Sequence, residues 1–296
     1  MQLKVVLRTI RLPFIALTPV CVFLGASFAL ASHVPVETLM AVLVLTGAVA
    51  AHISVNALNE YHDFSSGLDL QTSRTPFSGG SGALPAHPEA ATAVLAAGLL
   101  SLLTDIAIGG YFIMETGASI LPIGIAGVVL VASYTQWINR SPWLCLIAPG
   151  LGFGTLMVIG THLVLTGKYS EPVWLVSLVP FFLTNNLLLV NQYPDIKADA
   201  RVGRKTFPIA FGVNKSNVVY ALFMTAAYAT IVLLVATGGI PVTGLIALLP
   251  MALSLLALKG AVRHQAGIGE QPRYMAANVA AAILTPLLLG MAIITG

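Results

Sequence analysis

Residues 38–58, TLMAVLVLTGAVAAHISVNAL, form an apolar run of 21 residues without Asp, Glu, Lys or Arg. About 20 such residues are needed for a helix to cross the hydrocarbon core of a bilayer. The run is continuous, whereas a strand of a membrane barrel would alternate apolar and polar residues. It therefore predicts a membrane-spanning helix and decides the class of fold expected for the rest of the chain.

Similar runs occur along the whole sequence. Of the 296 residues, 57% are hydrophobic and 8% charged, whereas a soluble protein carries about 25% charged residues. This composition excludes a soluble domain, a disordered chain and a nucleic-acid-binding protein. We expect a single all-α, polytopic membrane domain over residues 1–296, with nine transmembrane helices at 12–32, 38–58, 91–114, 118–138, 143–165, 172–192, 217–237, 240–258 and 275–295.

The first run leaves one alternative open. Lys4, Arg8 and Arg11 precede it, and it ends in Ala29-Leu30-Ala31-Ser32, so it could be a cleaved secretory signal. Its length and the eight runs that follow favour a membrane span.

The basic residues predict the orientation of the chain. If nine spans alternate in direction, thirteen of the fourteen Lys and Arg residues lie on the side of the N-terminus, and only Lys168 lies on the other. Cytoplasmic loops are enriched in Lys and Arg. We therefore expect a cytoplasmic N-terminus in the cell membrane, with the two longest loops, 59–90 and 193–216, facing the cytoplasm.

These two loops follow the same short pattern. The first copy reads Asn59-Glu60-Tyr61-His62-Asp63 and the second reads Asn191-Gln192-Tyr193-Pro194-Asp195. A basic residue and Thr follow each copy, at 74–75 and 205–206. Two copies 132 residues apart, with four spans between them, share one orientation and predict parallel internal repeats. The loops are then expected to face each other across an axis along the membrane normal.

The side chains of the repeated pattern are mostly oxygen donors. On a helix the Asn and Asp residues of each copy lie one turn apart and share a face. Carboxylate and carboxamide oxygens, with no Cys and no paired His, favour Mg²⁺. The candidate metal ligands are Asn59, Asp63, Asp69, Asn191, Asp195 and Asp199.

Basic residues stand among these acids and suit phosphate oxygens. The candidate diphosphate-binding residues are Arg74, Lys197, Arg201, Arg204 and Lys205. Together, the charged loops and the apolar spans predict a site for a diphosphate that carries a hydrocarbon tail. Loops between spans are often polar only because they are exposed to water. The repetition of the pattern at equivalent positions disfavours that interpretation here.

At these residues the chain resembles the UbiA superfamily of intramembrane prenyltransferases. The first loop is similar to the family's Asn-x-x-x-Asp-x(3 or 5)-Asp motif, here Asn59, Asp63 and Asp69. The second is similar to its Asp-x-x-x-Asp motif with a following Gly and Lys-Thr, here starting at Asp195 and Asp199. The resemblance covers essentially the whole chain.

Within this superfamily the spacing of the first motif, with Tyr61 and Gly67, is closest to the branch that contains 1,4-dihydroxy-2-naphthoate prenyltransferases of menaquinone synthesis. Glu60, Phe153 and Pro194 depart from residues common in that branch. These positions concern the acceptor and the grip on the diphosphate more than the metal ligands, so the reaction class is better defined than the acceptor.

The resemblance implies transfer of a prenyl group from an isoprenoid diphosphate to an aromatic, quinone-precursor-like acceptor. Mg²⁺ would assist ionisation to an allylic cation and release of pyrophosphate. The residues expected to act directly are Asp63, Asp195, Arg74 and Lys197. The expected substrate pocket contains His52, Asn56, Tyr61 and Tyr193.

Three other functions are considered. The acceptor could be non-aromatic, such as a glyceryl phosphate lipid. A secondary transporter would place its ion site near the membrane midplane, whereas these acids cluster at one face. A phosphotransferase of the CDP-alcohol type has one Asp-rich signature, whereas this chain has two. Asp105, in the middle of the third run, is either functional, as acids inside spans commonly are, or bonded to neighbouring hydroxyls or tucked toward the outer end of the span.

Overall fold

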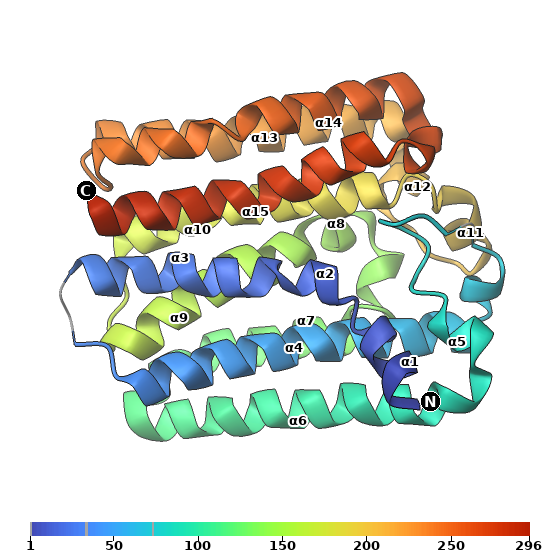
Figure 1. The fold of residues 1–296 in the computed structure, drawn as a ribbon, viewed down its shortest axis with the longest axis horizontal. Coiled ribbons are helices and arrows are strands. Elements are labelled where there is room, and N and C mark those ends of the chain that lie inside the picture. The colour runs from blue at the N-terminus through green and yellow to red at the C-terminus, as the bar shows by residue number, and fades with distance from the viewer. Residues whose placement is uncertain (1, 33–34, 73) are drawn as a thin grey trace.

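The computed structural model describes residues 2–32, 35–72 and 74–296, and these residues form helices, turns and loops without a strand. Eight helical segments are long and apolar enough to cross a membrane. The chain is therefore an integral, multi-pass, all-helical membrane protein. Its long helices lie side by side along one direction (Figure 1). Hydrogen bonds within each helix satisfy the backbone N–H and C=O groups inside the membrane.

The first half of the chain contains the elements α1 (Gln2–Thr9), α2 (Leu12–Ile15), α3 (Leu17–Ala31), α4 (Thr38–Ser65), η1 (Leu68–Leu70), α5 (Ala83–Ala86), η2 (Pro88–Ala90), α6 (Ala91–Thr116), η3 (Ala118–Ile120), α7 (Leu121–Ser133) and η4 (Ile138–Arg140). The second half contains α8 (Pro142–Gly150), η5 (Leu151–Leu156), α9 (Met157–Thr166), α10 (Glu171–Asn191), α11 (Ile196–Arg201), α12 (Phe207–Phe211), α13 (Val213–Ala236), η6 (Val242–Leu248), α14 (Met251–His264), η7 (Gln265–Glu270) and α15 (Pro272–Thr295).

The expected span at 118–138 is shorter in the structure. Its helical part, η3 and α7, ends at Ser133, and its 16 residues cover about 24 Å, less than the roughly 30 Å of a hydrocarbon core. Ser133 is also the one buried residue of α7. The other eight expected spans correspond to the eight long apolar segments, so the count of nine stays a prediction.

Glycines let several helices approach closely. A side chain at Gly25 of α3 would meet the Val158 carbonyl of α9, and one at Gly290 of α15 would meet the Phe23 ring. Inside a membrane, where lipid is as apolar as leucine, such close packing replaces the hydrophobic driving force. Tight contacts of α3 with α9 and α15 therefore hold the first and last helices against the middle of the chain.

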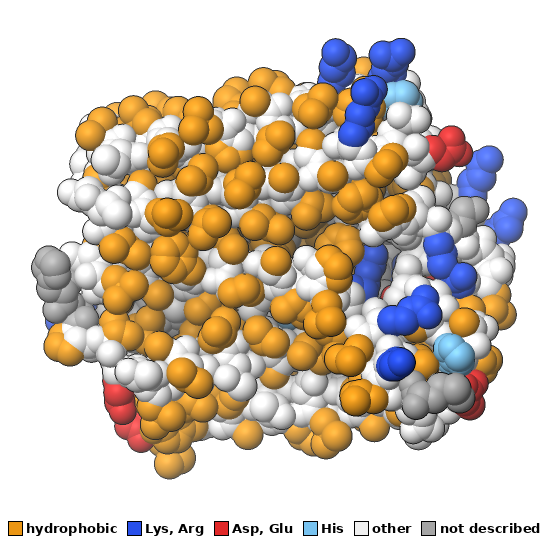
Figure 2. All heavy atoms as spheres, in the orientation of Figure 1, with side chains coloured by type: hydrophobic (Ala, Val, Ile, Leu, Met, Phe, Trp, Pro, Cys, Tyr) orange, Lys and Arg blue, Asp and Glu red, His pale blue; other side chains and the backbone are white. Residues whose placement is uncertain are grey.

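The two copies of the repeated pattern lie at the same end of the bundle. Helices α4 and α10 run in the same direction (Figure 1), and their C-terminal ends carry Asn59 to Asp63 and Asn191. Most of the Lys and Arg side chains visible in Figure 2 gather at that end, while hydrophobic side chains cover the face along the helices. We call this end of the bundle the polar end.

Candidate functional site

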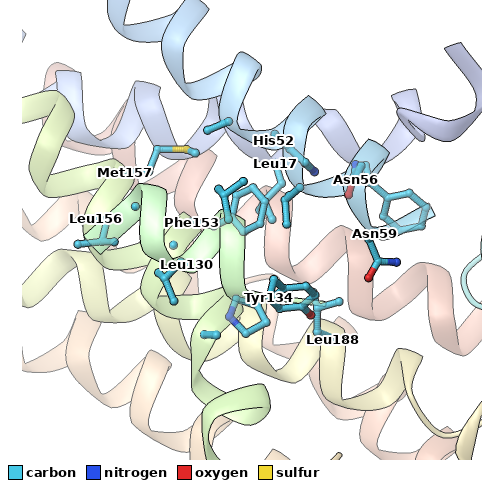
Figure 3. Close-up of a pocket in the computed structure, with 18 of the residues that line it drawn as sticks. Leu17, His52, Asn56, Asn59, Leu130, Tyr134, Phe153, Leu156, Met157 and Leu188 are labelled. Carbon is cyan, nitrogen blue, oxygen red and sulfur yellow. The ribbon is translucent and has the colours of Figure 1, made fainter. Parts of the chain in front are cut away.

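A cavity of about 400 Å³ lies inside the bundle, between α4, α6, α7, η5, α9 and α10. Apolar side chains form most of its wall, and Figure 3 shows His52, Leu17 and Phe153 around its middle section, with Asn59 nearby on α4. At the polar end the wall carries six candidate ligands and cations from both motifs: Asn59, Asp63, Asn191, Asp195, Asp199 and Arg204. The cavity thus joins a polar end to an apolar interior.

Asn59 and Asp63 form one side of this polar end. One turn apart on α4, they are joined by a hydrogen bond from Asn59 Nδ2 to Asp63 Oδ2 of 2.8 Å. The Asn59 carbonyl oxygen accepts a hydrogen bond from Thr135 Oγ1 at 3.1 Å. Because both groups of the carboxamide are engaged, the amide orientation is defined and its oxygen faces the chain that follows α7.

Arg204 links the two motifs. Its guanidinium pairs with Asp63 of the first motif and, at 3.0 Å, with Oδ1 of Asp199 of the second. The side chain of Arg204 is only 15% exposed. Gly203, in the left-handed region at φ 80°, reverses the chain just after α11 and so returns Arg204 toward Asp199. A buried cation shared by two carboxylates holds the two loops together.

A glycine-rich segment, residues 77–82, covers the polar end, and we call it the cap segment. Its Gly79 N–H donates to Asp195 Oδ2 at 3.0 Å. Its Ser81 donates from N–H and from Oγ to the two Glu60 carboxylate oxygens, at 2.6 and 2.7 Å. At Gly80, where φ is 71°, a Cβ would lie 2.8 Å from Asp69 Oδ1. The segment therefore needs glycine to lie this close to the acids.

Four buried oxygens at this end have no hydrogen-bond partner among the described residues: Asp69 Oδ2, Asn191 Oδ1, Asp195 Oδ1 and Thr206 Oγ1. Buried polar atoms are normally paired, so unpaired oxygens fit a bound cation. No three carboxylate, imidazole or thiol groups converge as a complete metal site within the ranges that the structure describes. This donor set suits Mg²⁺, which usually takes one or two carboxylates and fills its shell with water and phosphate oxygens.

The acids of the loops are held in an environment that favours protonation when no metal is bound. Burial, together with the charge of Asp199, raises the pKa of Asp195 to about 7. Burial, with the charges of Glu60 and Asp63, raises the pKa of Asp69 to about 7. Burial also raises the pKa of Asp199, while the charge of Arg204 opposes this rise. A divalent cation would relieve the repulsion among these carboxylates.

Other candidate diphosphate ligands lie farther out. Arg74 is exposed and donates from Nη2 to the Asp69 backbone carbonyl at 3.0 Å. The side chains of Lys197, Arg201 and Lys205 are exposed and do not belong to the cavity wall. Of the five basic candidates, Arg204 alone lines the cavity.

The structure separates the four expected pocket residues into two pairs. His52 and Asn56 line the cavity. Tyr61 and Tyr193 do not, contrary to the expectation from sequence. Tyr61 packs with residues of α1, α5 and α6, and Tyr193 is fully buried, with its hydroxyl donating to Asn217 Oδ1 at 2.9 Å. Both rings point from their helix ends toward neighbouring elements, a direction that the spacing in the sequence does not show.

Arg11 is a cavity residue that sequence reasoning treated only as a topology charge. It lines the cavity and donates from Nη2 to the Phe77 carbonyl of the cap segment at 3.4 Å. Its backbone is left-handed, with φ 58°, a conformation that a non-glycine residue adopts only at some cost. No sequence signal marks that conformation. Glu60 was missed as a holder of the cap segment because its partner, Ser81, lies 21 residues away.

Comparison with protein families gives one assignment over almost the whole chain. Residues 18–294 match the UbiA prenyltransferase family. The chain is 28% identical over 247 residues to a 1,4-dihydroxy-2-naphthoate octaprenyltransferase of Bacillus subtilis strain 168, covering 82% of this chain and 78% of that protein. It is 24% identical over 237 residues to the protein of the same name from Haemophilus influenzae, covering 76% of this chain and 75% of that protein.

Solved structures share the fold. A UbiA homolog from Archaeoglobus fulgidus, solved with DMAPP and Mg²⁺, superposes with a TM-score of 0.65 at 16% identity, and the match covers 98% of this chain and 99% of that one. The all-helical architecture is therefore that of UbiA proteins.

Proposed function

Because this chain belongs to the UbiA prenyltransferase family and is a prenyltransferase, we propose that it transfers the prenyl group of an isoprenoid diphosphate to an aromatic acceptor at the polar end of its cavity. We also propose that this end faces the cytoplasm. The relatives named for 1,4-dihydroxy-2-naphthoate support an aromatic acceptor, and the concentration of Lys and Arg at the polar end supports the orientation.

One observation carries the proposal. Side chains of both repeated motifs meet at the polar end of a cavity that is otherwise lined mainly by apolar groups, with Arg204 paired to one acid from each motif. A diphosphate needs the charged groups and its hydrocarbon tail needs the apolar wall. A transporter would instead hold its ion near the middle of the membrane.

We assign Mg²⁺ binding to Asn59, Asp63, Asn191, Asp195 and Asp199, with Asp69 beside them. When bound, Mg²⁺ supplies the positive charge that stabilises the departing diphosphate. Arg204 would turn from its carboxylate partners toward the phosphate oxygens once the cation compensates those acids. The cap segment and the apolar wall would keep water from the allylic carbon after the C–O bond breaks.

The other basic residues have outer roles in this proposal. Arg74, Lys197, Arg201 and Lys205 are exposed around the polar end, where they attract the diphosphate and hold the released pyrophosphate. In the cavity, the rings of His52 and Phe153, 4.6 Å apart between centroids at an interplanar angle of 69°, would contact the flat ring of the acceptor. Tyr134 also lines this region and would offer an aromatic face to the allylic cation.

The test uses purified protein in nanodiscs with labelled geranylgeranyl diphosphate, Mg²⁺ and 1,4-dihydroxy-2-naphthoate. We expect Mg²⁺-dependent release of pyrophosphate together with a prenylated ring. Asp63→Ala and Asp195→Ala should each lower kcat/KM by at least about a hundredfold, because each removes a ligand that holds the ion stabilising the leaving group. Glu171→Ala, an exposed acid at the opposite end of the bundle, is the matched control and should retain activity.

Acceptor and reaction class are tested separately. If pyrophosphate is released only with a glyceryl phosphate lipid, the aromatic acceptor is wrong and the reaction class stands. If neither acceptor supports Mg²⁺-dependent release, or if the two Asp variants behave as the Glu171 control does, the assignment of the site is wrong.

A further inference from the structure

Asp105 stands apart from the site described above. Among the described residues of the cavity wall, the other acids, Asp63, Asp195 and Asp199, lie at the polar end, whereas Asp105 lies in the middle of the membrane-spanning helix α6. It has no ion pair and no hydrogen-bonding or charged neighbour in the part of the chain that the structure describes. An unpaired acid inside a membrane is costly and is retained for a reason.

The position of Asp105 along the cavity follows from its neighbour on α4. A Cβ on Gly47 would lie 3.6 Å from Asp105 Oδ1, so the carboxyl group lies at the level of Gly47. Gly47 precedes Asp63 by 16 residues on the same helix, which at 1.5 Å per residue corresponds to about 24 Å. The carboxyl group therefore lies about 24 Å from the polar end.

The cavity at this depth is wide because its wall contains glycines. Gly109 of α6 and Gly124 and Gly127 of α7 line it, and a Cβ at any of them would meet no atom within 4 Å. Beyond Asp105 the wall continues with Phe112 and Ile120. A hydrocarbon tail that starts at the polar end thus passes directly beside an unpaired carboxyl group before it reaches the far end.

The depth can be expressed in isoprene units. An extended peptide advances about 1.2 Å per main-chain bond, and at the same advance the four main-chain bonds of one isoprene unit span about 5 Å. A tail anchored by its diphosphate near Asp63 therefore reaches Asp105 with its fourth or fifth unit. Shorter tails end before the carboxyl group, and longer ones must cover it.

A prenyl tail that covers Asp105 gains little binding free energy to compensate for the cost. A prenyl tail leaves lipid, not water, when it enters the cavity, so additional apolar contact with the wall adds little. The carboxyl group, in contrast, loses any water that solvates it in the cavity and finds no protein partner in exchange. The free energy of binding therefore becomes less favourable for a donor whose tail is long enough to reach Asp105.

We propose that Asp105 selects donors by length, so that the preferred substrates are isoprenoid diphosphates of up to about four isoprene units. This inference rests on the proposed function, because it concerns the donor of the same reaction. It predicts a shorter donor than the octaprenyl group in the names of the relatives.

The experiment compares farnesyl, geranylgeranyl and octaprenyl diphosphates with the full-length protein in nanodiscs. Two quantities are measured: kcat/KM for pyrophosphate release, and Kd for the corresponding unreactive thiolodiphosphates. We expect the protein to prefer geranylgeranyl over octaprenyl by at least about tenfold in both quantities, the scale of one buried polar group left without a partner. Asp105→Leu should reduce that ratio to about threefold or less.

Two further variants complete the design. Thr104→Leu changes the neighbouring residue, which is exposed on the lipid side of α6, and should leave the ratio as it is. Asp105→Ser replaces the carboxyl by a hydroxyl that can bond the carbonyl one turn earlier, as Thr104 does with Leu100 at 2.9 Å. It should shift the ratio in the same direction as Asp105→Leu and covers the case in which leucine prevents folding.

The outcomes separate the two proposals. A native ratio near one, or an unchanged ratio in both Asp105 variants, overturns selection by length while leaving the transferase intact. Absence of turnover with every donor contradicts the proposed function, and the Kd values of the thiolodiphosphates then still decide whether Asp105 responds to tail length.

Discussion

Arg204 is the residue on which the geometry of the polar end depends most. Removing it leaves Asp63 and Asp199 buried without their cation. Arg204→Ala should destabilise the metal-free protein by about 3 to 5 kcal/mol and lower kcat/KM by at least about a hundredfold, because the diphosphate also loses its buried cation. Thermal unfolding in detergent and pyrophosphate release measure the two effects.

Added Mg²⁺ provides an internal check on this prediction. The ion would compensate the two acids and should restore part of the stability of Arg204→Ala, but not its activity. Arg263→Ala is the control, because Arg263 lies in the last turn of α14 with an exposed side chain and has no part in the proposed site; its unfolding temperature and activity should stay close to the native values. Equal behaviour of the two variants would refute a special role for Arg204.

Glu60 and Ser81 should act as one unit, because both hydrogen bonds of the Glu60 carboxylate go to Ser81. We expect Glu60→Gln and Ser81→Ala each to raise KM for the donor several-fold and to speed hydrogen exchange at Gly79 and Gly80. The double variant should be no worse than the more affected single variant, since the effects of substitutions at two contacting residues are not additive. Additive losses, or a weakened Mg²⁺ affinity in Glu60→Gln alone, would instead identify Glu60 as a metal ligand.

The raised pKa values of Asp69 and Asp195, both about 7, give Mg²⁺ binding a defined pH dependence. Below pH 7 each metal-free carboxyl holds a proton that the ion must displace, and above pH 7 it does not. Mg²⁺ affinity should therefore rise by about tenfold per pH unit and per displaced proton up to about pH 7, then level off. Titration calorimetry between about pH 5.5 and pH 8.5 tests this, and a flat profile would contradict it.

The same shifts predict the pH dependence of folding stability. The folded, metal-free protein binds these protons more tightly than the unfolded chain, whose carboxyl groups titrate near pH 4. Its stability should therefore fall as pH rises from about 4 to 7. Saturating Mg²⁺ should reverse this trend, because the ion binds the ionised carboxylates of the folded state.

At the scale of elements, the π-helical segment η5 depends on glycine where it crosses α10. A Cβ on Gly154 would collide with the Phe181 backbone, whereas one on Gly152 would find its nearest atom, Leu130 Cδ1, 4.0 Å away. Gly154→Ala should therefore cost about 1 to 3 kcal/mol from overpacking and also lower activity, since η5 and α10 both line the cavity. Gly152→Ala, two residues away, should leave stability nearly unchanged. Thermal unfolding compares the two, and equal stabilities would contradict the close packing.

The helices were predictable from sequence to different degrees. Long apolar runs such as 38–58 define spans by length and composition alone, and the structure extends that one to Ser65 because the repeated pattern continues the helix. The run at 118–138 misled on length, since hydropathy does not detect where a helix ends, and α7 ends at Ser133. The crossing at Gly154 has no sequence signal, because it depends on which helix lies opposite.

At the site, the arrangement of residues that are close in sequence was predictable. Contacts between residues that are distant in sequence were not. The Asn and Asp residues of each motif share a helix turn, so their spacing indicated a common face. The cap segment with its Glu60 contact, and the left-handed Arg11, arise from tertiary packing over tens of residues. Tyr61 and Tyr193 show the same limit, since their rings point away from the cavity that their motifs flank.

For the whole molecule, the unequal distribution of charge gives a testable orientation. Thirteen of fourteen Lys and Arg residues are expected on one side of the membrane and Lys168 on the other. In intact cells an impermeant maleimide should label Lys168→Cys from outside and should label Arg201→Cys only after lysis. The native Cys21 and Cys145 are both buried, so the unsubstituted protein is the blank. The reverse labelling pattern would place the polar end outside, whereas labelling of both sites in intact cells would refute the alternation of spans between them.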